Sequence, residues 1–255
     1  PALPLPRDFV AQGYTPWLLD HRLSHRLPYA GGKHTTDTLS RFDIPLALRR
    51  IYAEEANQPF DVFAHCVGAA AFAMAVLRGR ADAAPDRSMV RSATLHAVHP
   101  WIVPSAGNQF SAALAALYKD ALPDGLQIDP IPPKDAGLMD QVVDRIAATL
   151  PWALRDRLGH EQDRTRDETG FAVCNRMTLF YGQEWLHDNL HAATHARLAE
   201  LVGEGGLEVF RQLFFMALRR RLTDRNGENA YLTHKRLMAH WTFPTLFVHG
   251  SDNRV

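Results

Sequence analysis

The chain has 255 residues, and its 28 lysines and arginines balance its 28 aspartates and glutamates, so its formal net charge is zero. This balance argues against nucleic acid or an anionic membrane surface as a general partner. The two cysteines, Cys66 and Cys174, are too few for a disulfide framework and are typical of a reduced, cytoplasmic protein. No apolar run is long enough to span a bilayer and the N-terminus carries no signal-peptide pattern, so we expect no membrane span.

The first hundred residues alternate between strand and helix patterns, as α/β proteins do. Residues 13–20 predict a strand, and residues 44–56 predict a helix for which Asp43 is the expected N-cap. Residues 60–64 form a short apolar run typical of a buried strand, and residues 89–98 predict another. The length allows one large domain with an ample core, or such a domain with an inserted cap.

The most informative motif of the chain is Ala64-His65-Cys66-Val67-Gly68. It follows a predicted strand and precedes a helix rich in small residues, which is the layout of the nucleophile elbow, G-x-S-x-G, of α/β-hydrolases. Small residues two positions before and after the nucleophile suit that sharp turn, although Ala stands where Gly is usual. A cysteine in an apolar run is more often a packing residue. The strand–turn–helix setting nevertheless favours a nucleophilic Cys66 and acyl transfer through a thioester.

Residues 100–240 differ in character, because prolines separate short helical patterns. Helices are predicted at residues 109–119, 138–150, 174–180, 186–202 and 207–221. Residues 243–250 then form an apolar strand pattern that ends in glycine. We therefore predict an α/β core made of residues 1–99 and 241–255, interrupted by a helical cap insertion at residues 100–240.

These segments together resemble the α/β-hydrolase fold superfamily, and within it the hydrolase-like domains associated with GMC (cholesterol-oxidase-like) oxidoreductases. The likeness is carried by Trp17-Leu18-Leu19-Asp20-His21-Arg22, the Cys66 motif, His99-Pro100-Trp101, Phe180-Tyr181-Gly182 and residues 248–255. It implies a mostly parallel sheet with a helical cap, no cofactor, and an associated GMC oxidoreductase domain as a candidate partner. It also implies that the first strands and the C-terminal end of the fold are missing from this chain.

The resemblance assigns roles to several residues. Cys66 is the expected nucleophile, and the backbone N–H of Val67 is the expected oxyanion donor. Asp252 or Asn253, after the last strand, is expected to orient the catalytic histidine. The usual G-x-x-D spacing places Asn253 at the acid position, whereas the residue type favours Asp252. The family order puts the histidine after the acid, so we expect it beyond Val255.

The histidines within the chain are weaker candidates for the general base, and we assign that role to none of them. His65 adjoins the nucleophile, so its side chain must point away from that of Cys66. His99 follows a strand at the end of the sheet where this fold keeps its active site, and is either a pocket residue or a structural histidine that caps the strand. Three histidines at four-residue spacing could hold a metal, but without a His-Glu-x-x-His pattern we expect a polar helix face and no metal: His187, His191 and His195.

Three functions agree with these features. Our prediction is a hydrolase of carboxylic esters, thioesters or lactones that forms an acyl-enzyme. The small apolar substrate would be bound by cap aromatics, although such residues are usually core: Trp101, Trp152, Trp185, Phe214 and Phe215. An acyltransferase is the second, because Cys66-Val67-Gly68 resembles the cysteine elbow of polyhydroxyalkanoate synthases. The third is a non-catalytic module that docks to a partner oxidoreductase.

Overall fold

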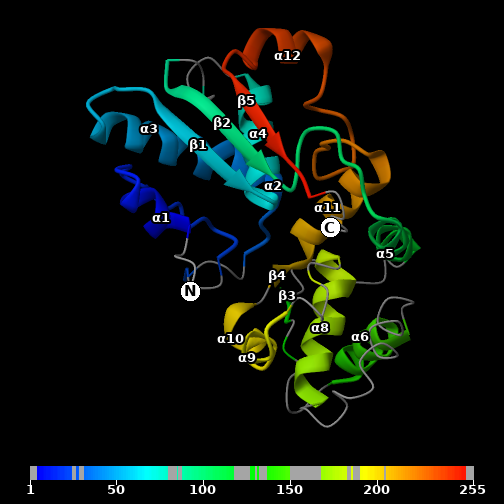
Figure 1. The fold of residues 1–255 in the computed structure, drawn as a ribbon. Coiled ribbons are helices and arrows are strands. Elements are labelled where there is room, and N and C mark those ends of the chain that lie inside the picture. The colour runs from blue at the N-terminus through cyan, green and yellow to red at the C-terminus, as the bar shows by residue number, and fades with distance from the viewer. Residues whose placement is uncertain are drawn as a thin grey trace.

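The structure, a computed structural model, describes residues 5–24, 27–28, 32–79, 85, 88–117, 127–129, 131, 137–149, 168–182, 185, 190–203 and 205–250. This part of the chain is a mixed α/β fold with a small parallel sheet and many helices, which confirms the α/β class of the prediction (Figure 1). None of the helices in these ranges combines the length and the apolar character needed to cross a membrane.

The main sheet has three parallel strands, and the last residues of β1 and β2 lie side by side. Their order across the sheet is β1 (Phe60–His65), β2 (Val90–His96) and β5 (Thr245–Val248). The strands predicted at residues 60–64, 89–98 and 243–250 are thus confirmed. Parallel strands need crossover connections, and in Figure 1 all three arrows point toward the helices that lie beyond the sheet.

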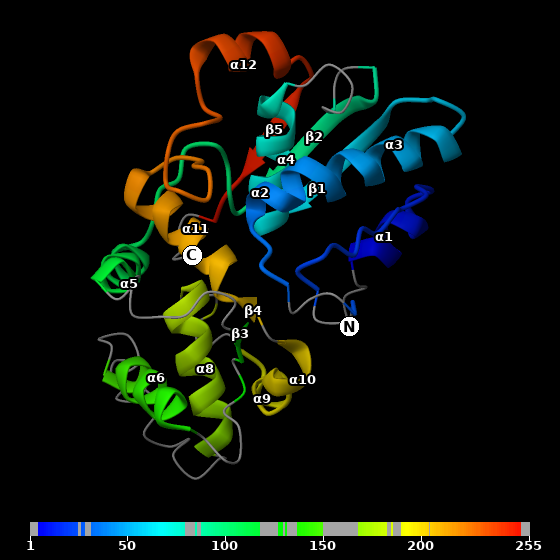
Figure 2. The same ribbon diagram turned by 180° about the vertical axis from the view of Figure 1, so that it is seen from behind.

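Helix α4 (Val67–Arg78) connects β1 to β2 and forms the centre of the main core. Every residue from 69 to 77 is buried. A helix that is apolar all round must be covered on all sides. The sheet covers one side of α4, while α3 (Ile44–Glu54) and α12 (His234–His240) pack against others. Figure 2 shows α3 and α4 together on one face of the sheet. The predicted helix at residues 44–56 is therefore confirmed as α3.

Two expectations for the N-terminal part are wrong. Residues 14–20 form no strand, since no described strand pairs with them in a hydrogen-bond ladder, and Trp17 and Leu18 are exposed. They follow a helix that was not predicted, α1 (Leu5–Ala11), whose Phe9 ring meets the Phe63 ring of β1 edge-on with centroids 6.3 Å apart.

Asp43 is the second of these errors, because it does not cap α3. The backbone is already helical there, since a π-helix, η1 (Leu39–Asp43), runs directly into α3. The carboxylate of Asp43 instead accepts hydrogen bonds from the Arg22 guanidinium at 2.7–3.0 Å. This ion pair holds the loop that follows residue 20 against the start of α3.

A helical part lies beyond the carboxyl ends of the strands (Figure 1). It comprises α5 (Ala106–Leu117), α6 (Leu138–Thr149), α8 (Glu168–Tyr181), α9 (Ala192–His195), α10 (Leu198–Leu201), α11 (Leu207–Arg219) and an antiparallel pair of two-residue strands, β3 (Gln127–Ile128) and β4 (Gly205–Gly206). The predicted helices are confirmed except for residues 186–202, whose described part forms the two short helices α9 and α10.

The helical part has small cores of its own, but its last portion joins the main core. Arg176 of α8 is only 2% exposed, and its guanidinium bonds to Asp140 and Asp144, which fixes α8 against α6. Met216 of α11 and Tyr231 belong instead to the main core around α4. The segment of residues 100–240 therefore contributes at its end to the packing of the sheet.

Candidate active site

Cys66 occupies a strained turn between β1 and α4. Its backbone angles are φ 49° and ψ −123°, a conformation that costs a residue with a Cβ about 1–3 kcal/mol. The surrounding structure enforces this turn, because the Cys66 N–H donates to the carbonyl of His96 at 3.0 Å and the Cys66 carbonyl accepts from the N–H groups of Ala69 and Ala70. The side chain is half-buried. The turn thus presents the thiol at the end of the sheet.

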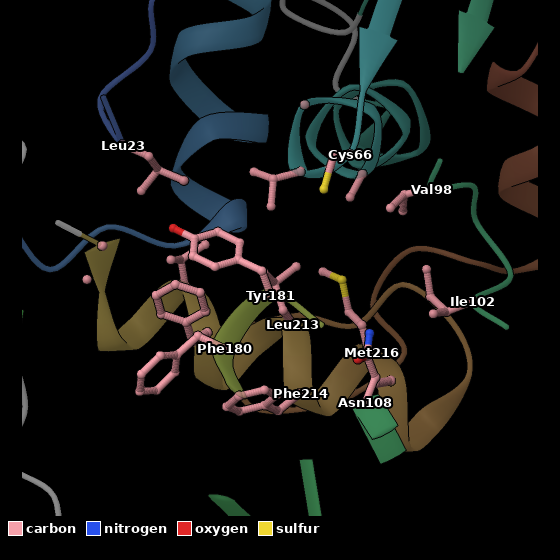
Figure 3. A pocket seen from close by; sticks show the side chains of 18 of the residues that line it. Leu23, Cys66, Val98, Ile102, Asn108, Phe180, Tyr181, Leu213, Phe214 and Met216 are labelled. Atoms are coloured by element: carbon pink, nitrogen blue, oxygen red, sulfur yellow. The ribbon is translucent and has the colours of Figure 1, made fainter. Parts of the chain in front are cut away.

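The thiol faces an apolar cavity of about 430 Å³, here named the Cys66 cavity. Its roof is the start of α4, and its opposite wall includes Phe180, Tyr181, Leu213 and Phe214. Figure 3 shows the Cys66 sulfur pointing from the turn before α4 toward Tyr181, Leu213 and Met216. None of the described residues that line the cavity is Asp, Glu, Lys or Arg. A cavity of this size and character suits a small, neutral, largely apolar molecule.

The N-terminus of α4 supplies donors at the same place. The first four N–H groups of a helix have no intrahelical acceptor, and α4 begins with Val67, directly after the thiol. Val67 and Gly68 both line the cavity. A Cβ added at Gly68 would meet no described atom within 4 Å. Packing therefore does not require glycine at position 68, and the lack of a side chain there leaves the cavity open beside Cys66.

His65 lines the cavity but is engaged by another histidine. Its Nδ1 lies 2.7 Å from Nδ1 of His96, and the two rings stack with centroids 4.9 Å apart. At this distance one nitrogen donates to the other, so at least one of the two Nδ1 atoms acts as an acceptor. Much of the His65 side chain is exposed. The pKa of His65 is nevertheless lowered, mainly by the partial burial of its ring and to a smaller extent by the charge of His96.

His99, the other predicted pocket histidine, is not among the residues that line the cavity. Its ring packs edge-on against Phe247 and His249, with centroids 5.7 and 4.9 Å away. Burial and the neighbouring His249 lower the pKa of His99. The structure thus places His65 next to Cys66 in the cavity and His99 in a separate histidine pair.

His21 is a cavity residue that no sequence motif predicted as part of the site. It lines the cavity with Cys66, and its Nδ1 is buried without a hydrogen-bond partner among the described residues. Burial lowers the pKa of His21 and outweighs the opposing effects of Asp43 and Asp20, so the ring is neutral at pH 7. The only sequence signal for it was its place in the segment of residues 17–22.

Cys174 lies away from the cavity, in a cluster with Val173, Met177 and Leu198. Its sulfur is 3.2 Å from Nε2 of His195. Among the described residues no group of three metal-ligating side chains is found. His191 accepts from the N–H of Ala193 at the start of α9, and His187 lies outside the described residues.

The other residues predicted for the site differ in whether they line the Cys66 cavity. Among the described cap aromatics only Phe214 lines the cavity. Trp101 is exposed, Trp185 packs beside Cys174 and Phe215 packs against Gly227. Trp152, Asp252 and Asn253 lie outside the described residues. Comparison of the sequence with protein-family models and with curated proteins finds no match.

Proposed function

We propose that this chain is an α/β-hydrolase-fold acyl hydrolase that acts on small apolar esters, thioesters or lactones through Cys66. One observation carries the proposal. Cys66 has a positive φ in an enforced strand-to-helix turn, and its thiol faces an apolar cavity. A strained turn that exposes a side chain between a parallel strand and a helix is typical of the nucleophile elbow. The parallel sheet and the helices beyond its carboxyl end are consistent with that fold.

In the proposed reaction the Cys66 sulfur attacks the carbonyl carbon of the substrate and forms a C–S bond. The negative charge that develops on the carbonyl oxygen would be stabilised by the N–H of Val67 at the start of α4. The C–O or C–S bond to the leaving group then breaks, and the leaving alcohol or thiol takes up a proton. Water next attacks the thioester, releases the carboxylic acid and restores the thiol.

A base must accept the thiol proton and later that of the water. His65 and His21 are the cavity histidines of the described chain, and Nδ1 of His65 is engaged by His96. Nδ1 of His21 is buried and has no partner among the described residues, so His21 is our candidate for the base. Asp252 or Asn253 would orient a histidine as the resemblance implies.

Product analysis tests the function directly. The full chain would be incubated with p-nitrophenyl butyrate in water alone and in water containing an alcohol acceptor. Hydrolysis predicts butyric acid in both cases, whereas an acyltransferase would convert the added alcohol to its butyrate ester. We expect Cys66→Ala to lower turnover by at least about 10³-fold, because the covalent intermediate can no longer form.

Cys174→Ala is the matched control, because it removes the other thiol from a place outside the cavity. It should keep the wild-type turnover. Equal turnover in wild type and Cys66→Ala would overturn the proposal. An unreactive Cys66 would favour the non-catalytic module that docks to a GMC oxidoreductase.

A further inference from the structure

The wall of the Cys66 cavity contains a polar atom that no protein group satisfies. Ser111 of α5 lines the cavity and is only 4% exposed, and its Oγ has no hydrogen-bond partner among the described residues. A hydroxyl within a helix commonly bonds to a backbone carbonyl of the preceding turn, and this one does not. Buried polar groups without a partner are rare in folded proteins, so this hydroxyl is a feature to be explained.

Ser111 shares its helix face with a second polar residue of the same wall. Asn108 lies three residues earlier on α5, which places both side chains on one face, and it also lines the cavity. Figure 3 shows Asn108 on the side of the cavity opposite to Cys66, beyond Met216. Between these two ends the wall is mainly apolar, with Val98, Ile102 and Leu213 among its residues. The cavity is therefore polar at the thiol, apolar in the middle and polar again at its far end.

We propose that this far end recognises an oxygen on the substrate, so that the preferred acyl group is apolar but carries a hydroxyl or keto oxygen remote from the scissile carbonyl. A serine hydroxyl can donate to a keto oxygen or accept from a hydroxyl. Charged groups are excluded, because none of the described lining residues is Asp, Glu, Lys or Arg to neutralise them. The inference rests on the proposed function, since it names the acyl group that Cys66 accepts.

The test compares two kinds of p-nitrophenyl ester, those of octanoic acid and those of its oxo derivatives with the keto group in the distal half of the chain. The rate of acyl transfer to Cys66 is measured for each by mass spectrometry. We expect the best oxo ester to acylate wild type about tenfold faster than the octanoate, the effect of one neutral hydrogen bond. In Ser111→Ala this ratio should fall to about one, and in Ser111→Thr, which keeps the hydroxyl, it should be largely restored.

Thr223→Val is the matched control, because Thr223 also carries a buried hydroxyl without a described partner but does not line the cavity. It should keep the wild-type ratio. Acylation of Cys66 with equal rates for all esters, or a ratio unchanged in Ser111→Ala, overturns the inference and leaves the proposed function standing. The absence of any acyl group on Cys66 overturns the proposed function itself. If a variant fails to fold, the comparison of the esters on the wild-type protein decides the inference.

Discussion

Cys66 and Cys174 lie in opposite surroundings. Cys66 is held at φ 49° in the turn before α4, is half-buried and faces the cavity. Cys174 lies in the middle of α8, is 3% exposed and packs with apolar side chains. The regular helix around Cys174 stores no strain, whereas the sheet and α4 enforce the strain at Cys66 through the hydrogen bonds of its own backbone.

This difference shows that a nearby histidine is not sufficient to make a thiol a candidate nucleophile. Nε2 of His195 lies 3.2 Å from the sulfur of Cys174. Apolar side chains nevertheless cover that sulfur almost completely, so no substrate can approach it. Cys66 instead lies at the N-terminus of a helix, which favours the thiolate, and beside a cavity that can admit a substrate.

The largest expected effect that would sharpen this comparison is in the rate of alkylation. Iodoacetamide should modify Cys66 at least about tenfold faster than Cys174 in the folded protein, because only Cys66 combines access with a helix N-terminus. Peptide mass spectrometry after short exposures measures both rates in one sample. In urea the two rates should converge. Equal rates in the folded protein would contradict the contrast between the two surroundings.

A smaller effect is expected on stability. Cys66→Gly should raise the free energy of unfolding by about 1 kcal/mol relative to Cys66→Ala, because glycine adopts this positive-φ conformation without strain. Urea denaturation of both variants gives the difference. In the regular helix around Cys174 the same pair of substitutions should have the opposite order, with glycine less stable than alanine. The same order at both sites would show that the turn at Cys66 is not strained.

The smallest expected effect is in the pH dependence of stability. Burial lowers the pKa of His21 below its ordinary value of 6.5, so the unfolded chain takes up this proton at a higher pH than the folded protein does. The contribution of His21 to the free energy of unfolding is therefore complete above pH 6.5. It is lost as the pH falls from there through the lowered pKa of the folded protein.

Replacing this histidine should therefore flatten the pH dependence. His21→Gln should make the decline of the free energy of unfolding below pH 6.5 less steep, as measured by urea denaturation at several pH values. His234→Gln, at an exposed position on α12, is the matched control and should keep the wild-type slope. Identical slopes for both variants would show that burial at the cavity does not perturb His21.

Much of the fold could be predicted from the sequence, because its strands are short apolar runs bounded by turns. The three strands and most helices lie where those patterns placed them. Residues 13–20 have the same apolar character, but a strand exists only when a neighbouring strand pairs with it, and that is a property of the tertiary structure. Asp43 failed as a cap because a π-helix precedes α3 and makes the backbone helical there already, and its carboxylate pairs with Arg22, which is distant in sequence.

The candidate site was predictable only around the turn. Strand, cysteine and small-residue helix are contiguous in sequence, so the motif at Cys66 could be recognised. His21 and Ser111 belong to the same cavity but lie far away along the chain. Their significance comes from burial without a hydrogen-bond partner, which no spacing in the sequence reveals.

The most direct test of the central claim is the site of acylation. The full chain would be incubated briefly with p-nitrophenyl butyrate, quenched in acid and digested, and the cysteine peptides examined by mass spectrometry. The account predicts a butyryl group on the peptide that contains Cys66 and none on the peptide that contains Cys174. A folded protein that consumes the ester without an acyl group on Cys66, or that carries it on Cys174 instead, would contradict the account.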